Sequence, residues 1–379
     1  MIPLCEPALL GRELEYVSDC VTTGWISSAG EYVLRFERAL ADYLGVKYAV
    51  ACNSGTSALH IGLLLSGFQP DEEVIVPTVT FIATVNPIRY LGGRPVFMDC
   101  DEFCNVDVEA IARFLGEECE ARDGGTFNRT TGRRVSTVIP VHVFGTPADL
   151  DAITALAERY HLKVIEDATE SLGSLYKGRR CGGLTPIGCL SFNGNKIVTT
   201  GGGGAIVTND ETIATRARFL TTQAKEDGLG YVHPEIGYNY RMNNLLAALG
   251  LAQLETIEQR LACKRGNFAL YEQALGPAGR ERLIQQPSFS DSNRWFYAYL
   301  CSSAAVKDTL IKNCLAAGIQ VRPLWYPNHL QRPYREMQSY QISRALDYYD
   351  RLVNIPCSVG LTEDQIAQVA AVIRESDNL

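Results

Sequence analysis

The chain has 379 residues, of which 43 are acidic and 35 are basic, so its formal net charge at neutral pH is −8. This length is sufficient for two domains that each bury their own core. The acidic balance argues against a general nucleic-acid binder or a membrane-surface binder, and we expect neither partner.

The amino-terminal segment, residues 1–14, lacks the basic region and following apolar stretch of a secretion signal. No apolar run reaches the roughly 18 residues that a membrane span requires. The 12 cysteines are scattered singly, without the spacing of metal sites or redox motifs. We therefore expect a cytoplasmic protein with reduced thiols and no bound metal.

A strand over residues 48–52 is predicted to turn through small polar residues, 53–57, into a helix whose apolar side chains include Leu59 and Leu63. Backbone N–H groups at such a helix start, assisted by the hydroxyl of Thr56, are typical of a phosphate site. The turn is not a P-loop, because no Gly-Lys-Ser/Thr sequence follows the glycine.

Strands and helices then alternate, with a strand at 73–77, a helix at 83–92 and a strand at 94–101. The same pattern continues through residues 135–168. It predicts a mainly parallel sheet covered by helices on both faces. The polar, glycine-rich stretch 116–134 interrupts the pattern and is predicted to be an exposed insertion, which covers either the site or a subunit edge.

An apolar strand at 164–166 brings Asp167 to its carboxyl end, which is where ligands bind in open α/β sheets. The alternative interpretation of Asp167 is a helix N-cap. Lys196 lies between the predicted strands 187–192 and 205–208, next to four glycines. In a tight pocket a lysine loses its proton more easily, and its neutral amine forms Schiff bases with aldehydes; the alternative is an ordinary surface lysine. A Schiff-base lysine and an acid that keeps a pyridine nitrogen protonated are what pyridoxal phosphate chemistry requires.

The carboxyl-terminal part begins with a predicted long amphipathic helix, residues 245–275, that leads into a smaller domain. This domain is expected to contain a strand at 296–303, a helix at 306–318 and a closing helix that Thr362 caps. We predict a large domain over residues 1–250 and a small α/β domain over residues 251–379.

Seven motifs resemble one known family in their order along the chain: residues 22–30, 53–60, 73–90, 140–153, 164–174, 191–210 and 237–254. The family is the DegT, DnrJ, EryC1 and StrS group of sugar aminotransferases, which act on nucleotide-linked keto sugars. The resemblance covers nearly the whole chain. It implies the fold of the type I pyridoxal phosphate enzymes, a mainly parallel sheet sandwiched by helices with a smaller α/β domain.

The resemblance implies that Lys196 holds pyridoxal 5'-phosphate as a Schiff base and moves a proton during the reaction. Asp167 matches the residue that pairs with the ring nitrogen. Phe81 matches an aromatic residue that stacks on the ring, and its alternative is a place in the core. The phosphate is implied to bind Gly55, Thr56 and Ser191.

Asn239 matches a residue that reaches the phosphate of the neighbouring subunit, which implies a homodimer with a shared active site. Its alternative role is that of a turn former. Glu170 and Asn193 occupy cofactor-binding positions near the ring but depart from the commonest family pattern, which has glutamine or histidine at the first and histidine at the second.

The Ala-Thr-Glu-Ser sequence at 168–171 resembles members that aminate C4 of UDP-linked 4-keto-6-deoxy N-acetyl sugars, as in bacillosamine and legionaminic acid synthesis. The related sugar dehydratases carry histidine in place of the Schiff-base lysine, so Lys196 favours transamination.

The nucleotide-sugar substrate that the resemblance implies carries a negative diphosphate, so we expect basic residues near the mouth of the site. The candidate substrate-binding residues are Trp25, Ser27, Arg241, Arg322 and His329. Arg241 has a structural ion pair as its alternative, and the aromatic, basic segment 320–334 has a packed proline-rich loop as its alternative.

We expect a ping-pong transamination in which L-glutamate is the amino donor and the cofactor passes through its pyridoxamine 5'-phosphate form. The product would be an amino sugar for surface glycans such as lipopolysaccharide. The alternatives are a pyridoxal phosphate-dependent lyase or aldolase acting on an amino acid, with Arg322 binding the carboxylate, and a non-catalytic regulator that binds the cofactor.

Overall fold

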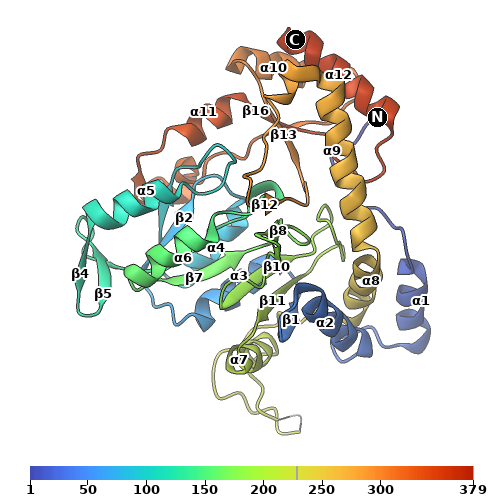
Figure 1. The fold of residues 1–379 in the computed structure, drawn as a ribbon. Helices are drawn as coiled ribbons and strands as arrows, with labels where there is room; N and C mark the ends of the chain where they lie inside the picture. Colours follow the sequence, from blue (N-terminus) through green and yellow to red (C-terminus); the bar gives the residue numbers. More distant parts are fainter. Residues whose placement is uncertain (228, 379) are drawn as a thin grey trace.

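The computed structural model describes residues 1–227 and 229–378, and its centre is a ten-stranded sheet with helices on both faces (Figure 1). The main strand order is β1-β11-β10-β7-β6-β2-β3-β15. Strand β11 runs antiparallel to both of its neighbours, whereas the strands from β10 to β15 are parallel. The predicted α/β class with a mainly parallel sheet is thus confirmed. The strands are β1 (Tyr48–Cys52), β2 (Glu73–Pro77), β3 (Arg94–Met98), β6 (Arg134–Val138), β7 (Lys163–Asp167), β10 (Ile187–Ser191), β11 (Gly204–Thr208) and β15 (Ser339–Tyr340), with the hairpin β4 (Cys119–Arg122) and β5 (Gly125–Asn128).

Side chains of the sheet alternate between two cores because successive residues of a strand point to opposite faces. On β1, Val50 packs with Leu59 of the first sheet-covering helix, whereas Ala51 packs with Phe36 on the other face. On β2, Ile75 belongs to a third core cluster. This cluster includes a helix on the same face of the sheet as Ala51. The helices around the sheet are α1 (Glu13–Thr23), α2 (Glu31–Leu44), α3 (Gly55–Leu65), α4 (Asn86–Tyr90), α5 (Val108–Arg113), α6 (Leu150–Arg159), α7 (Glu211–Thr221) and α8 (Asn244–Glu255).

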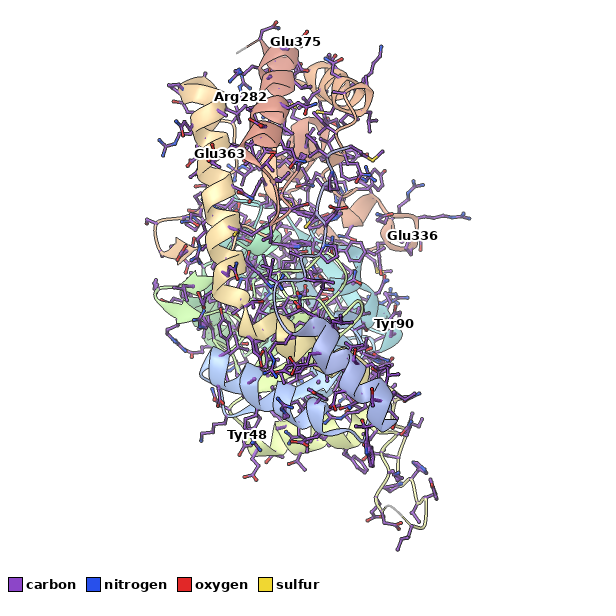
Figure 2. All side chains as sticks on the ribbon, turned by 90° about the vertical axis from the view of Figure 1, so that its right-hand side faces the viewer. Tyr48, Tyr90, Arg282, Glu336, Glu363 and Glu375 are labelled. Atoms are coloured by element: carbon purple, nitrogen blue, oxygen red, sulfur yellow. The ribbon has the colours of Figure 1, made fainter. Side chains whose placement is uncertain are left out.

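The carboxyl-terminal elements form a second layer around a three-stranded antiparallel sheet, in the order β13-β16-β14. Its strands are β13 (Tyr297–Leu300), β14 (Arg322–Pro323) and β16 (Leu352–Ile355), and its helices are α9 (Ile257–Arg280), α10 (Ala304–Ala316), α11 (Arg344–Arg351) and α12 (Glu363–Asp377). Figure 2 shows α9 running beside α12 toward the end of the molecule where Glu363 and Glu375 lie. The amino terminus joins this part, because Ile2 pairs with Ile319 (Figure 1). Three short strands, β8 (Leu175–Tyr176), β9 (Arg179–Arg180) and β12 (Ser290–Asp291), form a separate small sheet.

The prediction of a single long helix over residues 245–275 is wrong, because the segment forms two helices. The chain leaves helical geometry at Thr256, with φ −112° and ψ 15°, so that α8 and α9 are separate helices. α8 packs against α1 and α2, and α9 packs against α12. The two helices thus serve different layers, which a continuous amphipathic pattern does not reveal. The domain boundary between residues 250 and 251 stays a prediction.

The stretch 116–134 contains the β4–β5 hairpin, and β5 extends the sheet by pairing with β6. The hairpin forms one edge of the molecule in Figure 1. None of the helices in the described part of the chain combines the length and apolar character of a membrane span.

Candidate active site

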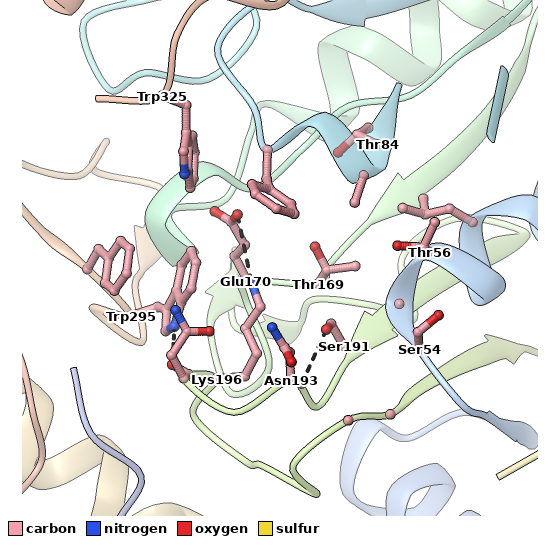
Figure 3. A pocket seen from close by; sticks show the side chains of 18 residues that line it. Ser54, Thr56, Thr84, Thr169, Glu170, Ser191, Asn193, Lys196, Trp295 and Trp325 are labelled. Atoms are coloured by element: carbon pink, nitrogen blue, oxygen red, sulfur yellow. Dashed lines mark hydrogen bonds and ion pairs between the residues drawn. The ribbon is translucent and has the colours of Figure 1, made fainter. Parts of the chain in front are cut away.

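A cavity of about 340 Å³ opens at the carboxyl ends of β7 and β10, where the carboxyl-terminal layer meets the sheet (Figure 3). Ligand pockets of this size class hold small organic molecules. Residues 116–134 do not line it. The lining residues are Ser54, Gly55, Thr56, Leu59, Phe81, Ala83, Thr84, Thr169, Glu170, Ser191, Asn193, Asn195, Lys196, Gly202, Gly203, Trp295, Phe296 and Trp325.

Lys196 lies in the loop between β10 and β11, and its side chain enters this cavity (Figure 3). Its backbone N–H donates to the carbonyl of Asn193 at 3.0 Å, which fixes the turn. The Nζ atom lies 3.8 Å from Oε1 of Glu170 and 3.6 Å from the ring centroid of Trp295. Burial lowers the pKa of Lys196, while the carboxylates of Glu170 and Asp167 oppose that shift. The surface-lysine alternative is therefore excluded, and the amine is one that loses its proton more easily than in water.

Glu170 is buried against Lys196 and the backbone of Phe144, whose N–H donates to Oε2 at 2.8 Å. Burial raises the pKa of Glu170 to about 7, and the charge of Lys196 and the Phe144 hydrogen bond act in the opposite direction. Near neutral pH this carboxyl group therefore exchanges a proton readily.

The opposite side of the cavity is an anion cradle, formed by Gly55, Thr56 and Ser191 at the start of α3 and the end of β10. Ser54 caps the helix by accepting a hydrogen bond from the backbone of Ser57 at 3.0 Å. The first-turn N–H groups of an α-helix have no partner within the helix and attract anions. A Cβ atom at Gly55 would lie 2.8 Å from Cβ of Ser191, so only glycine leaves this space open. A phosphate group fits here.

Asp167 is fully buried at the end of β7, directly behind the cavity wall. Its carboxylate accepts hydrogen bonds from the Thr84 hydroxyl at 2.8 Å and from the Thr169 backbone N–H at 3.1 Å. Both of these threonines line the cavity. A carboxylate accepts about four hydrogen bonds, so Asp167 retains capacity for a protonated ring nitrogen.

Phe81 lines the cavity with a side chain that is 54% exposed, so it is not the core residue of the alternative interpretation. Its ring is free to stack on a planar ligand. An amine, a buried carboxylate, an anion cradle and a free aromatic face surround one space, and this set of groups fits pyridoxal 5'-phosphate.

In the described chain, this cavity is not lined by any of the five predicted substrate-binding residues, nor by Asn239, which was predicted to reach the phosphate of the neighbouring subunit. The Arg241 guanidinium pairs with Glu37 and donates to the Ala51 carbonyl at 3.3 Å, which is the ion-pair alternative. Asn239 is exposed, and its backbone carbonyl accepts from Asn53 at 3.2 Å.

Trp25 and Ser27 are also exposed, and their backbone carbonyls accept from Asn244. Arg322 is exposed on β14, and Nδ1 of His329 lies 2.7 Å from the Thr78 hydroxyl. Burial lowers the pKa of His329, although the charge of Asp99 opposes this.

Sequence reasoning missed the aromatic side of the cavity, which consists of Trp295, Phe296 and Trp325. Trp325 lies within the aromatic segment 320–334 noted in the sequence, but Trp295 precedes a strand and carried no local signal. The rings of Trp295 and Phe296 stack with centroids 4.1 Å apart and an interplanar angle of 8°. The Trp295 ring covers Lys196 on the side away from the anion cradle (Figure 3).

A second polar cluster, formed by His142, Glu166 of β7 and Cys181, is buried. Nε2 of His142 donates to Glu166 at 3.0 Å, and its Nδ1 accepts from the Ala148 backbone at 3.1 Å. Glu166 also accepts from the backbone N–H groups of residues 182 and 184. Because His142 and Glu166 already have protein partners, we interpret the cluster as structural.

The family model for the DegT/DnrJ/EryC1/StrS aminotransferases matches residues 8–374. The chain is 38% identical to the GDP-perosamine synthase of Caulobacter vibrioides, over 98% of this chain and 97% of that protein. It is 37% identical to the putative pyridoxal phosphate-dependent aminotransferase EpsN of Bacillus subtilis, over 98% and 95%. A crystal structure of an aminotransferase of this family from Brucella abortus superposes with a TM-score of 0.88 at 28% identity, covering 97% of this chain and 96% of that one.

The match covers almost the full length of the chain, and all residues that line the cavity fall within it. The chain therefore belongs to the DegT/DnrJ/EryC1/StrS aminotransferase family.

Proposed function

We propose that this chain transfers an amino group from L-glutamate to C4 of a nucleotide-linked 4-keto-6-deoxy sugar. The broader activity follows from its family: it is a pyridoxal phosphate-dependent aminotransferase of nucleotide sugars. The observation that carries the proposal is the placement of the Lys196 amine, beside Glu170 and opposite the anion cradle, in one cavity.

The residues present would hold the cofactor at three points. The anion cradle would bind the phosphate, Asp167 would keep the ring nitrogen protonated, and Lys196 would hold the aldehyde carbon. When bound, this cofactor withdraws electrons from the carbon that bears the amino group, which makes the proton on that carbon removable.

Lys196 would then move that proton, because its Nζ atom lies inside the cavity and burial favours its neutral form. Glu170, 3.8 Å away, would balance the charge of the ammonium form. The rings of Trp295, Phe296 and Trp325 would limit the access of water to the amine. The same steps in reverse order deliver the amino group to the keto sugar.

Two sugar nucleotides are candidates for the acceptor. The Ala-Thr-Glu-Ser sequence at 168–171 favours the UDP-linked 4-keto-6-deoxy-N-acetylhexosamine. The similarity to a GDP-perosamine synthase favours a GDP-linked sugar that is aminated at C4. Both share the C4 keto group and the diphosphate, and we infer C4 chemistry from what they share.

We further propose a homodimer with a shared active site. Lys196 is the only lysine or arginine among the described residues that line the cavity, yet the substrate carries a charged diphosphate. Exposed apolar side chains gather on α1 and just after it: Leu14 is 82% exposed, Val21 63% and Trp25 58%. A second copy seated there would bury this surface and bring Asn239, Trp25 and Ser27 toward the partner's cavity.

Cytoplasmic location and a product used for surface glycans such as lipopolysaccharide are part of this proposal.

Mixing purified, cofactor-loaded protein with L-glutamate tests the donor half of the reaction. We expect 2-oxoglutarate to be released in an amount equal to the cofactor, with loss of the yellow colour. A lyase, an aldolase or a non-catalytic regulator would release none.

The acceptor half is tested by a panel of UDP-linked and GDP-linked keto sugars offered to the aminated enzyme. We expect amino sugar to form from a 4-keto-6-deoxy compound, and the preferred nucleotide decides between the two candidates. Amination only of 3-keto sugars would overturn the C4 assignment.

A further inference from the structure

The indole ring of Trp295 forms a face against which the Lys196 ammonium group rests. The Nζ atom lies 3.6 Å from the ring centroid, and Trp295 is almost completely buried. A cation at this distance from an indole face is attracted by the negative charge density of the ring. Figure 3 shows Lys196, Trp295 and Glu170 close together, with a dashed line that joins the amine to the Glu170 carboxylate.

Each polar group of Trp295 has a partner that holds the ring in place. Its indole N–H donates at 2.7 Å to the carbonyl of Asn195, the residue that precedes Lys196 in the chain. Its backbone N–H donates to Oδ1 of Asn293 at 2.8 Å, and its carbonyl accepts from Nζ of the buried Lys264 at 2.7 Å. The ring is therefore tied to the Lys196 loop, and the backbone of Trp295 is tied to helix α9.

The same network reaches the other partner of the amine. The side-chain amide of Asn293 donates to the backbone carbonyls of Glu170, at 2.9 Å, and Leu172, at 3.0 Å. Asn293 thus holds the backbone of both Trp295 and Glu170. The distance from the Lys196 amine to the Trp295 ring and its distance to the Glu170 carboxylate therefore both depend on Asn293.

We propose that Trp295 is a positioning residue for Lys196: its ring holds the free amine inside the cavity, and its indole N–H anchors the backbone of the lysine loop. This inference rests on the proposed function, because a transaminase releases its lysine from the cofactor in each half-reaction. A free lysine has four rotatable bonds, and the ring keeps the amine close to where it must act again.

The ring also acts on the protonation of the amine, since an aromatic face favours the ammonium form. The charged and titratable groups that face Lys196 are Glu170, Asp167 and Cys5, from the loop after β7, the end of β7 and the amino-terminal segment. All three favour the ammonium form as well, against burial. Removing the ring while these groups stay in place isolates its contribution.

The test is acetylation of Lys196 by acetic anhydride in the full-length, cofactor-free chain, followed by mass spectrometry of its peptide over a pH series. The midpoint of the pH profile reports the protonation of the amine, and the limiting rate at high pH reports its accessibility. In Trp295→Leu we expect the midpoint to move to lower pH and acetylation at neutral pH to be about fivefold faster.

Trp325→Leu is the matched control, because Trp325 lines the same cavity and its ring lies 6.4 Å from that of Trp295. It should change only the limiting rate. Trp295→Phe keeps an aromatic face with weaker attraction and should place the midpoint between those of the wild type and Trp295→Leu.

An unchanged or raised midpoint in folded Trp295→Leu, or an equal shift in Trp325→Leu, would overturn the proposal. If Trp295→Leu does not fold, a Trp295→Phe midpoint at or above that of the wild type does the same. The measurement needs neither cofactor nor substrate, so failure of the glutamate reaction would refute the proposed function separately.

Discussion

The Lys196 amine is subject to opposing influences within one cavity. Burial favours its neutral form, whereas Glu170 at 3.8 Å and the Trp295 ring at 3.6 Å favour its charged form. A group that forms a bond to carbon as a neutral amine and then carries a proton must visit both forms. The balance of these effects is thus the physical basis of the proposed chemistry.

Glu170 gives the folded chain a pH-dependent stability. Burial raises the pKa of this carboxyl group from 4.5 to about 7. Between these values the unfolded chain binds fewer protons at this site than the folded chain, so stability falls as pH rises. From about pH 5 to about pH 8 the wild type should lose about 2 kcal/mol relative to Glu170→Gln. Urea denaturation of both cofactor-free proteins at the two pH values measures this, and parallel pH profiles would contradict it.

Gly55 should be required for cofactor binding rather than for folding. In Gly55→Ala the new Cβ would lie 2.8 Å from Cβ and 3.1 Å from Oγ of Ser191, inside the anion cradle. We expect cofactor affinity to fall at least about tenfold, which corresponds to 1.4 kcal/mol. Equilibrium dialysis measures the affinity.

The matched control is Gly266→Ala on α9, where an added Cβ meets open space. It should leave the affinity unchanged and stabilise the helix by about 0.5–1 kcal/mol. Equal affinities for the wild type and Gly55→Ala would show that the phosphate binds elsewhere.

At the residue scale, the sequence located residues at the cavity where a local pattern marks them. Asp167 stands at the end of an apolar strand, and Lys196 lies between two apolar strands. Gly55 stands in a turn before a helix. Trp295 was not predictable, because its contact with Asn195 joins residues 100 positions apart. For the same reason the pairing of Arg241 with Glu37 emerged only from the folded chain.

At the scale of elements, the central strands were predictable because they are apolar runs buried on both faces, and β1 and β2 begin and end where the sequence indicated. The antiparallel direction of β11 was not predictable, since the direction of a strand depends on the path of the loop that precedes it. The separation of α8 from α9 was also missed. Apolar residues continue across Thr256, so periodicity alone predicts one helix.

The cap of the last helix was predicted and is confirmed. Thr362 accepts from the Gln365 backbone at 3.2 Å, and the Gln365 side chain accepts from the Thr362 backbone at 3.0 Å. Thr362→Ala should therefore lower the free energy of unfolding by about 1 kcal/mol. Chemical denaturation measures this, with Thr362→Ser as the control that keeps the hydroxyl and loses little. Equal losses in the two variants would assign the effect to packing instead.

At the scale of the whole molecule, the cavity has one side from the large sheet and one from the carboxyl-terminal layer. The anion cradle and Lys196 come from the first, whereas Trp295 and Trp325 come from the second. The exposed apolar side chains of α1 and the candidate residues Trp25 and Asn239 lie outside this cavity. The proposed dimer would unite them with a partner's site.

Mixing two inactive variants tests the shared site. If Lys196 and Asn239 of different copies act in one site, Lys196→Ala and Asn239→Ala co-expressed in one cell should form mixed dimers with one intact site. Random pairing would restore about a quarter of the wild-type sites. The separately purified variants are the controls, and the readout is 2-oxoglutarate release. No recovery in the mixed dimers would contradict a site built from two copies.

The central claim is that Lys196 is the lysine that holds the cofactor. Borohydride reduction of the cofactor-loaded protein fixes the cofactor covalently to its lysine, and peptide mass spectrometry then identifies that residue. Lys264 is the main alternative as the cofactor-binding lysine, because it is a second lysine buried next to Trp295. We predict that the added mass lies on the peptide that contains Lys196. Its appearance on the Lys264 peptide, or on any other, would contradict the assignment.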